Sequence, residues 1–480
     1  MTVSPCRSDF LVYNKEIYQF LLTVRSQCAR SNKNKIASIS FEINLVDPLV
    51  VLAKLARASQ VTFYWENQVS GESIVAIDAV AKLEITGEAR FSSSEEFIQH
   101  SLSNLVCFEQ DKPNNTDIKN IQPRFFCSFS FFDENDESDY PFSSGTVFLP
   151  RWQISVKNNR CQAMVNLAID ANTNIDTILH VVWTKIEIIQ SLAYYSPNLN
   201  NSPAKYSQRL VANPEKFKAS VTSALKAIGA GDFSKIVLAS ALDIYSRTAF
   251  NIFKSLSNLR QQHPNCYIFS TSNGKGQSFI GASPERLINV NNHFLVTDAL
   301  AGSAPRGKTP EEDAANANRL LLSEKERHEH SLVIDFITQQ LLKLGLRPQF
   351  VKFQGVPRLR QLSNIQHLWT PITAVVPNNV HPLQIIAHLH PTPAVAGESR
   401  DIAMQQIRRY ENFERGLYAA PLGWVDTNGN CEFIVGIRSA LIDGNRARLY
   451  AGAGIVAGSD PMKELAEIQL KFQALLKALV

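Results

Sequence analysis

The chain has 480 residues, of which 45% are hydrophobic and 19% charged, with 21 Gly and 22 Pro. This composition is typical of a globular protein and excludes a disordered or fibrous chain. The 48 Lys plus Arg against 44 Asp plus Glu leave a formal charge of +4. Because no dense basic run occurs, we expect no nucleic-acid partner.

The cysteines and the first residues indicate the cellular compartment. Seven cysteines occur without a CxxC pair, which disfavours a zinc ribbon and a disulfide scaffold and indicates a reducing environment. Residues 1–16 lack the basic and apolar segments of a signal peptide, and no run of about 18 apolar residues occurs in the chain. We therefore expect a cytosolic (cytoplasmic) protein with no membrane partner.

Residues 1–205 are expected to form an N-terminal region of mixed strands and helices. The segments 36–43, 61–65 and 125–132 are rich in β-branched and aromatic residues, which predicts strands. The polar segment 109–123 predicts a surface loop.

The acidic run 133–139 (DENDESD) follows the third of these strands. A calcium-binding loop needs Gly at its sixth position and Glu at its twelfth, and both are missing here. The pattern favours a solvated hairpin.

The segment 196–207 is rich in Pro, Asn and Ser, which predicts a linker. We therefore place a second, catalytic region at 206–480. Asn213 and Pro214 are typical of a helix start, and the apolar run that begins at Lys235 predicts a strand.

The segment 323–330 (SEKERHEH) opens a predicted helix, whose first serine and the glutamate three residues later are spaced as a capping box. Glu329 falls on the apolar stripe of this helix. A buried carboxylate is costly unless a positive group meets it, so a buried ion pair with an arginine and a metal-ligand role both remain open. His328 and His330 lie on other faces of the helix and do not cluster with Glu329 as a chelate.

The last predicted helix begins at Asp460 and carries Glu464, Glu467 and Lys471 beside its apolar stripe. Glu467 and Lys471 are spaced as a surface salt bridge, which is one interpretation. The glycine-rich turn at 451–456 suggests another, because free amides at the start of this helix suit an anion, and the carboxylates could hold a divalent cation beside it.

Gly452, Gly454 and Gly458 also resemble a dinucleotide-binding fingerprint, which would indicate an NAD-dependent oxidoreductase. We reject this hypothesis because too little of the chain follows Gly458 to complete a βαβ unit of roughly thirty residues.

Three single residues have both a structural and a chemical interpretation. Lys235 is either a solvated edge charge or a partly desolvated base. Glu285, in a Ser-Pro-Glu turn, either begins a structural element or acts as a buried general acid. Arg438 ends an apolar strand and forms either a structural ion pair or a bidentate contact with a carboxylate.

Ten short segments occur along the chain in an order that favours the chemical interpretation of these residues. They are KIVLA (235–239), GASPERL (281–287), ALAGSAPRG (299–307), SEKERHEH (323–330), IQHLWTPI (365–372), LHPTPAVAG (389–397), FERGLYAAPLGW (413–424), FIVGIR (433–438), AGAGIV (451–456) and SDPMKELAEIQLK (459–471). Together they resemble the chorismate-utilising enzymes over residues 213–475, and within that family the isochorismate synthases of the menaquinone or phylloquinone type. The N-terminal region matches far less specifically, through features such as 63–66 (FYWE) and Gly71.

The resemblance implies an α/β (α+β) fold with two antiparallel sheets facing outward and helices between them. It also implies Mg²⁺ as the cofactor, held by Glu329 and Glu467 with Glu464 nearby, Lys235 as the base that activates water, and Glu285 as the acid. The implied substrate pocket is formed by Gly302, Ser303, His367, Ala394, Tyr418, Arg438, Gly452, Ala453, Gly454 and Lys471.

The implied substrate is chorismate, which carries two carboxylates. Water would add at C2 while the C4 hydroxyl leaves, giving isochorismate for quinone synthesis. Because water is a poor nucleophile and hydroxide a poor leaving group, this reaction needs a base, an acid and charge neutralisation together.

The sister activities differ at short motifs. Aminodeoxychorismate synthases carry a nucleophilic lysine in PIKG, where this chain has Ala301 in 299–302. Anthranilate synthases usually carry an LLES signature, which is missing here, and the chain has no glutaminase domain, so no obligate glutaminase partner is expected. Salicylate synthases share Lys235 and Glu285, and only the TPAV segment at 392–395 favours an enzyme that stops at isochorismate.

Salicylate synthase is therefore the first alternative, followed by anthranilate synthase component I. Ser240 departs from the family pattern, which usually has Arg at this position (KVVLAR), so any role of that Arg in positioning the base is in doubt. An inactive binding or regulatory relative is disfavoured because the proposed base, acid and metal ligands are all retained.

Overall fold

The computed structural model describes residues 7–108, 121–134, 140–194, 206–211, 213–350, 357–362 and 365–479. The expected loop at 109–123 and the expected linker at 196–207 lie almost entirely outside these ranges, as do residues 135–139 of the acidic run. Those three predictions therefore stay predictions.

The helices of the described chain begin and end as follows: α1 Arg7–Ser31, α2 Pro48–Leu55, α3 Arg90–Ser103, α4 Ile175–Ser191, η1 Leu192–Tyr194, α5 Pro214–Ala230, α6 Ile252–Gln262, α7 Pro310–Leu322, α8 Glu324–Lys343, α9 Pro382–Leu389, α10 Arg400–Tyr410 and α11 Pro461–Leu479.

The strands are β1 Lys35–Ile43, β2 Val61–Asn67, β3 Glu72–Ile85, β4 Leu105–Cys107, β5 Arg124–Phe129, β6 Gly145–Lys157, β7 Arg160–Ile169, β8 Tyr206–Leu210, β9 Lys235–Ser246, β10 Tyr267–Asn273, β11 Gln277–Ser283, β12 Arg286–Asn291, β13 Phe294–Pro305, β14 Gln349–Phe350, β15 Arg358–Gln361, β16 Ile365–Val375, β17 Pro421–Asp426, β18 Cys431–Val435, β19 Ser439–Asp443 and β20 Arg446–Val456.

The predicted helix starts are confirmed by their caps. The Asn213 side chain accepts a hydrogen bond from Glu215 N at the start of α5, and Ser323 Oγ accepts one from Glu326 N at the start of α8. The three strands predicted in the N-terminal region correspond to β1, β2 and β5, the last of which ends earlier than expected, at Phe129.

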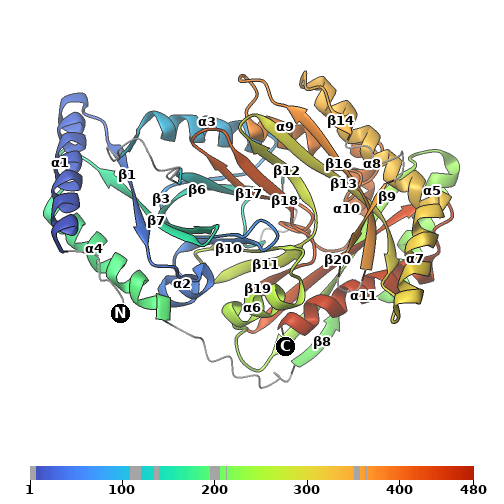
Figure 1. Cartoon of the computed structure of the whole chain (residues 1–480). Helices are drawn as coiled ribbons and strands as arrows, with labels where there is room; N and C mark the ends of the chain where they lie inside the picture. Colours follow the sequence, from blue (N-terminus) through green and yellow to red (C-terminus); the bar gives the residue numbers. More distant parts are fainter. Residues whose placement is uncertain are drawn as a thin grey trace.

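The strands form two antiparallel arms that both start at β6. One arm runs through β3, β2, β10, β11, β19, β20, β9 and β8. The other runs through β5, β17, β18, β12, β13 and β16. Ladder pairing joins the arms into one large sheet of a mixed α/β fold (Figure 1). Strand β4 pairs parallel to β1.

Pairing also crosses the boundary proposed at residue 205. Strand β2 pairs with β10, and β5 pairs with β17, so strands from both sides of the boundary share one sheet. The division into 1–205 and 206–480 therefore stays a proposal about sequence organisation.

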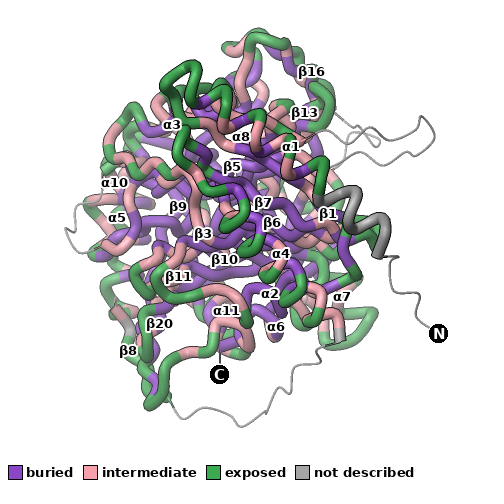
Figure 2. Tube along the Cα trace, turned by 90° about the vertical axis from the view of Figure 1, so that its left-hand side faces the viewer, coloured by how far each residue is buried: buried purple, intermediate pink, exposed green. Residues whose placement is uncertain are grey.

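The expected placement of the helices between outward-facing sheets is wrong. Every residue of β2 except Asn67 is buried, and β5, β17 and β18 are buried throughout, so both faces of these strands lie inside the molecule. The helices lie around the strands, and helices such as α5, α10 and α11 expose one side to solvent (Figures 1 and 2). The expectation failed because strands covered on both faces are rich in apolar residues throughout. This sequence pattern does not show whether a helix or another strand covers each face.

Among the described helices, none is both long and apolar enough to cross a membrane.

Candidate active site

A cavity opens where the two arms approach each other, and most of the predicted site residues line it. Its walls come from β9 and β20 of one arm, β13 and β16 of the other, and the first turns of α8 and α11. Of the residues predicted from the sequence, the lining includes Glu285, Gly302, Ser303, Glu329, His367, Ala394, Tyr418, Arg438, Gly452, Gly454, Glu464, Glu467 and Lys471.

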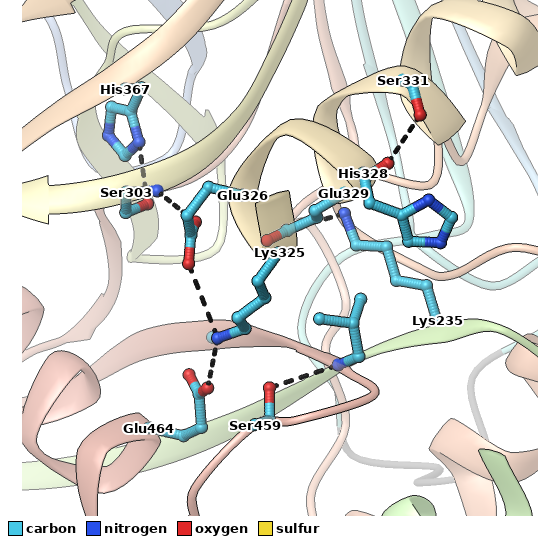
Figure 3. Close-up of polar contacts among 12 residues, drawn as sticks. Lys235, Ser303, Lys325, Glu326, His328, Glu329, Ser331, His367, Ser459 and Glu464 are labelled. Atoms are coloured by element: carbon cyan, nitrogen blue, oxygen red, sulfur yellow. Dashed lines mark hydrogen bonds and ion pairs between the residues drawn. The ribbon is translucent and has the colours of Figure 1, made fainter. Parts of the chain in front are cut away.

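Lys235 lies just behind this lining. Its side chain is fully buried, and its Nζ lies 2.8 Å from Oε1 of Glu329, which faces the cavity (Figure 3). Burial opposes ionisation of Glu329, but Lys235 outweighs that effect and lowers the pKa of this carboxyl. Glu329 is thus buried and paired with a positive group, as its place on the apolar stripe requires. That group is a lysine, whereas the ion-pair interpretation named an arginine, and the metal-ligand role stays open.

The side chains of Ala453, a predicted site residue, and of Ser240, which departs from the family pattern, face away from the cavity because side chains alternate along a strand. Gly452 and Gly454 of β20 line the cavity, so Ala453 between them points to the opposite face and contributes no side chain to the lining. Ser240 likewise lies on the face of β9 opposite Lys235 and Val237. The serine that replaces the usual arginine therefore removes no side chain from the cavity.

One end of the cavity holds four carboxylates and three lysines. Lys325 Nζ lies 3.2 Å from Glu464 and 3.5 Å from Glu326 (Figure 3). Its contact with Glu464 joins α8 to α11. The pair of Glu467 and Lys471 forms as the spacing predicts, at 2.7 Å, and it lies at the cavity.

The sequence analysis missed Lys325 and recognised Glu326 only as a capping residue. The Glu326 carboxylate instead accepts a hydrogen bond of 2.9 Å from Ser303 N. Burial and the neighbouring Glu329 raise the pKa of Glu326, and burial likewise raises the pKa of Glu464 even though Lys325 opposes the shift. The carboxylates are therefore close enough to affect one another.

This donor set suits a hard divalent cation, because carboxylate oxygens are the ligands that Mg²⁺ prefers. In the part of the chain that the structure describes, no three of these groups converge as a ready metal site. Each of the four carboxylates instead contacts a lysine ammonium. The chemistry of the carboxylates therefore fits such a cation. In this structure their negative charges are balanced by lysine ammonium groups.

The other end of the cavity is formed by Arg438, His367 and Ser303. Arg438 Nη2 lies 3.1 Å from His367 Nε2, and His367 Nδ1 lies 2.9 Å from Ser303 Oγ. A guanidinium can only donate, so Nε2 must accept and the ring proton must lie on Nδ1. Burial and the adjacent Arg438 lower the pKa of His367 well below its ordinary value, which agrees with a neutral ring. The Ser303 hydroxyl proton is then free to point elsewhere.

Backbone geometry shapes this end as well. Gly302 has φ = 77° and lies where the ladder between β13 and β16 shifts register, so it forms a bulge in a conformation that glycine favours. Arg438 has φ = 51°, which is uncommon for a residue with a side chain. Its Nη1 is buried and has no hydrogen-bond partner among the described residues.

Glu285 is the buried acid of the cavity. Burial and the charge of Asp298 raise its pKa to about 8, although Lys235 opposes the shift. A carboxyl with this pKa is mostly protonated near neutral pH and can donate a proton.

The residues that distinguish the sister activities also lie here. Ala301 lines the cavity, where the resemblance places a lysine in aminodeoxychorismate synthases. Ala394 and Val395 of the TPAV segment line the cavity too. Tyr450, which the sequence analysis missed, stacks on Tyr418 with 5.2 Å between ring centroids, and its two-residue spacing from Gly452 was the available signal.

The two histidines of the HEH segment do not join the carboxylates. His330 is buried, and its Nε2 lies 2.9 Å from Thr370 Oγ1. His328 is exposed. The two imidazoles thus lie in different surroundings, as their positions on different faces of the helix predict.

Comparison with known proteins identifies the family. The family model described as "Chorismate binding enzyme" matches residues 23–480. The salicylate biosynthesis isochorismate synthase of Pseudomonas aeruginosa is 31% identical, over 92% of this chain and 90% of that protein. Isochorismate synthase MenF of Bacillus subtilis is 29% identical, over 93% and 94%. The structure of MenF, the menaquinone-specific isochorismate synthase from Escherichia coli, matches with a TM-score of 0.75 and 26% identity, covering 96% of this chain and all of that one (100%).

The chain belongs to the chorismate-binding enzyme family and is an isochorismate-synthase-like enzyme. The matches extend through most of the N-terminal region, where the sequence motifs alone were weak.

Proposed function

We propose that the protein is an isochorismate synthase, an isomerase that adds water to C2 of chorismate while the C4 hydroxyl leaves. The observation that carries the proposal is Glu285, a buried carboxyl whose pKa of about 8 keeps it protonated in a cavity that also holds Arg438 and the pair of Lys235 and Glu329. Acid, base and anion-binding groups are the set that this reaction needs.

Arg438 is the group we assign to a substrate carboxylate. Its Nη1 has no hydrogen-bond partner among the described residues, its neighbour His367 is neutral, and no described carboxylate lies within ion-pair distance of it, although Glu467 is near enough to act on its charge. A buried donor without a partner is costly, and a carboxylate would satisfy it with a charge-assisted hydrogen bond. Ser303, Tyr418 and the backbone at Gly452 and Gly454 complete this part of the pocket.

Glu285 then gives its proton to the departing C4 hydroxyl, and Lys235 takes a proton from the attacking water. The two act on different protons and need different protonation states. Lys235 is an ammonium group paired with Glu329 in this structure. It must therefore lose a proton to solvent, as well as this partner, before its amine can accept a proton from water.

Glu329, Glu464 and Glu467 are the residues that would hold Mg²⁺. The bound cation would neutralise a substrate carboxylate, since Mg²⁺ held by a few carboxylates keeps open positions. Lys325 contacts Glu464 and Lys471 contacts Glu467, so both ion pairs would have to break for the cation to bind these carboxylates.

We further propose quinone synthesis as the pathway and the cytoplasm as the location. The menaquinone-specific enzyme of Escherichia coli matches over nearly the whole chain, which supports this choice, whereas the Pseudomonas aeruginosa relative belongs to salicylate biosynthesis. Restored menaquinone in a strain that lacks its own menaquinone-type synthase would support the pathway, and unchanged quinone levels despite active protein would contradict it.

The test of the activity is product analysis. Purified protein with chorismate and Mg²⁺ near neutral pH should give a mixture of isochorismate and chorismate by chromatography. Stoichiometric salicylate with pyruvate would make the protein a salicylate synthase. Anthranilate formed with ammonia would make it an anthranilate synthase component, and no turnover at all would contradict the proposal.

A further inference from the structure

Strand β9, which begins at Lys235, has an unusual edge beside the cavity. One side of it pairs with β20 from Lys235 to Tyr245, but β8 covers the other side only from Leu242 to Ser246. Near Lys235 a turn takes the place of a strand, since Val237 N donates to Ala396 O (2.7 Å) and Glu398 N donates to Lys235 O (3.0 Å).

A buried ion pair completes this edge. Ala239 N donates to Glu411 Oε1 at 2.7 Å, and Arg415 Nη2 donates to Val237 O at 2.8 Å. Arg415 also donates to both carboxylate oxygens of Glu411, at 2.8 and 2.6 Å, and through Nη1 to Val395 O at 2.9 Å. Its side chain is fully buried, and its guanidinium lies 4.3 Å from the ring centroid of Phe131.

The pair therefore ties together two walls of the cavity. Val237, two residues after Lys235, lines one wall, and Val395, next to Ala394, lines another. Arg415 binds the carbonyls of both, while Glu411 binds the strand at Ala239. Neither Arg415 nor Glu411 lines the cavity. Their hydrogen bonds therefore act on the cavity through the segments that they hold, while their charges also reach Tyr418 of the lining.

We propose that Arg415, with Glu411, is a positioning residue that holds Lys235 in register with the turn at 392–395. The proposal rests on the proposed function, since it concerns the base of that reaction. A lysine in place of Arg415 keeps the charge but cannot make the same set of planar hydrogen bonds. Because a misplacement of about 1 Å can cost about a hundredfold in rate, loss of this geometry should reduce turnover even in a folded protein.

Arg260 provides a matched control. Its guanidinium donates to Glu66 at 2.7 Å and to both oxygens of Asp47 at 2.7 and 2.9 Å, which ties α6 to β2 and the start of α2. None of these residues lines the catalytic cavity. Arg260 and Arg415 thus have comparable bonding, but only Arg415 holds the cavity walls.

The experiment compares Arg415→Lys and Arg260→Lys with wild type by Tm, kcat and KM for chorismate. Both variants should lose thermal stability, but only Arg415→Lys should lower kcat by about tenfold or more, with KM changed less than kcat. Glu411→Gln, which keeps an oxygen for Ala239 N, should lower kcat less than Arg415→Lys and decides the question if Arg415→Lys does not fold.

Normal kcat in folded Arg415→Lys, or an equal loss in Arg260→Lys, would overturn the positioning role. The same holds for normal kcat in Glu411→Gln if it is the only folded variant. Failure of the wild type to turn over chorismate would instead overturn the proposed function.

Discussion

The two ends of the cavity differ in the charged groups that they present. At the end formed by α8 and α11, four carboxylates face three lysines, and each charge has a partner within the protein. At the end formed by β13, β16 and Arg438, the guanidinium meets a neutral histidine and keeps one buried nitrogen without a partner among the described residues. The first end is suited to a cation and the second to an anion.

The largest effect is expected from removing divalent cations, which tests whether the end formed by α8 and α11 binds a cation. Excess EDTA should abolish isochorismate formation, and added Mg²⁺ should restore it, because the carboxylates of α8 and α11 are the natural ligands of such a cation. Chromatographic product assays measure the effect, with EDTA already saturated by Mg²⁺ as the control. Full activity in excess EDTA would remove the metal assignment of Glu329, Glu464 and Glu467.

Replacing the buried acid tests the site between the two ends. Glu285→Gln should lower kcat by at least about a hundredfold, because the amide cannot donate the proton that the leaving hydroxyl needs. Glu432→Gln is the control, since Glu432 is also a buried carboxyl of raised pKa but does not line the cavity. Comparable losses in the two variants would indicate a structural effect and contradict the acid role.

Removing the guanidinium should affect binding before chemistry. Arg438→Ala should raise KM about tenfold to a hundredfold, which corresponds to one lost charge-assisted contact. Steady-state kinetics with chorismate measure it, and Arg319→Ala, on the outer helix α7, serves as the control. A variant with unchanged KM and lowered kcat would move Arg438 from substrate binding to the chemical step.

The smallest expected effect is a shift of the pH profile. Because Glu285 acts in its protonated form with a pKa of about 8, kcat should fall as the pH rises through that value. The negative charge of Asp298 raises this pKa, so Asp298→Asn should move the alkaline limb to lower pH. Asp243→Asn, which removes another buried aspartate from its arginine partners, should leave the limb in place. If the alkaline limb does not shift in Asp298→Asn, the assignment of that limb to Glu285 is contradicted.

Local patterns predicted much of this site. The apolar stripe of α8 placed Glu329 inside the protein, and the helix and strand starts at Asn213, Ser323 and Lys235 are confirmed. Strand alternation accounts for the side chain of Ala453, which lies outside the lining between Gly452 and Gly454, whereas the role expected of its backbone amide stays a prediction.

What the sequence could not provide are partners from distant segments. The partner of Glu329 is Lys235 of another element, and a helical stripe shows only that some positive group is needed. Lys325 was missed, and Glu326 was recognised only as a capping residue, because a helix start already explains both positions. The two arms that leave β6 depend on long-range pairings, as does the placement of the helices outside them.

The most direct test of the account is Lys235→Ala with chorismate and Mg²⁺, followed by both turnover and substrate binding. The account predicts a fall in kcat of at least about a hundredfold, because the base that activates water is gone. Chorismate affinity, measured by tryptophan fluorescence or calorimetry, should survive, since Arg438 is untouched. Near-normal kcat in Lys235→Ala would contradict the proposed base and the mechanism built on it.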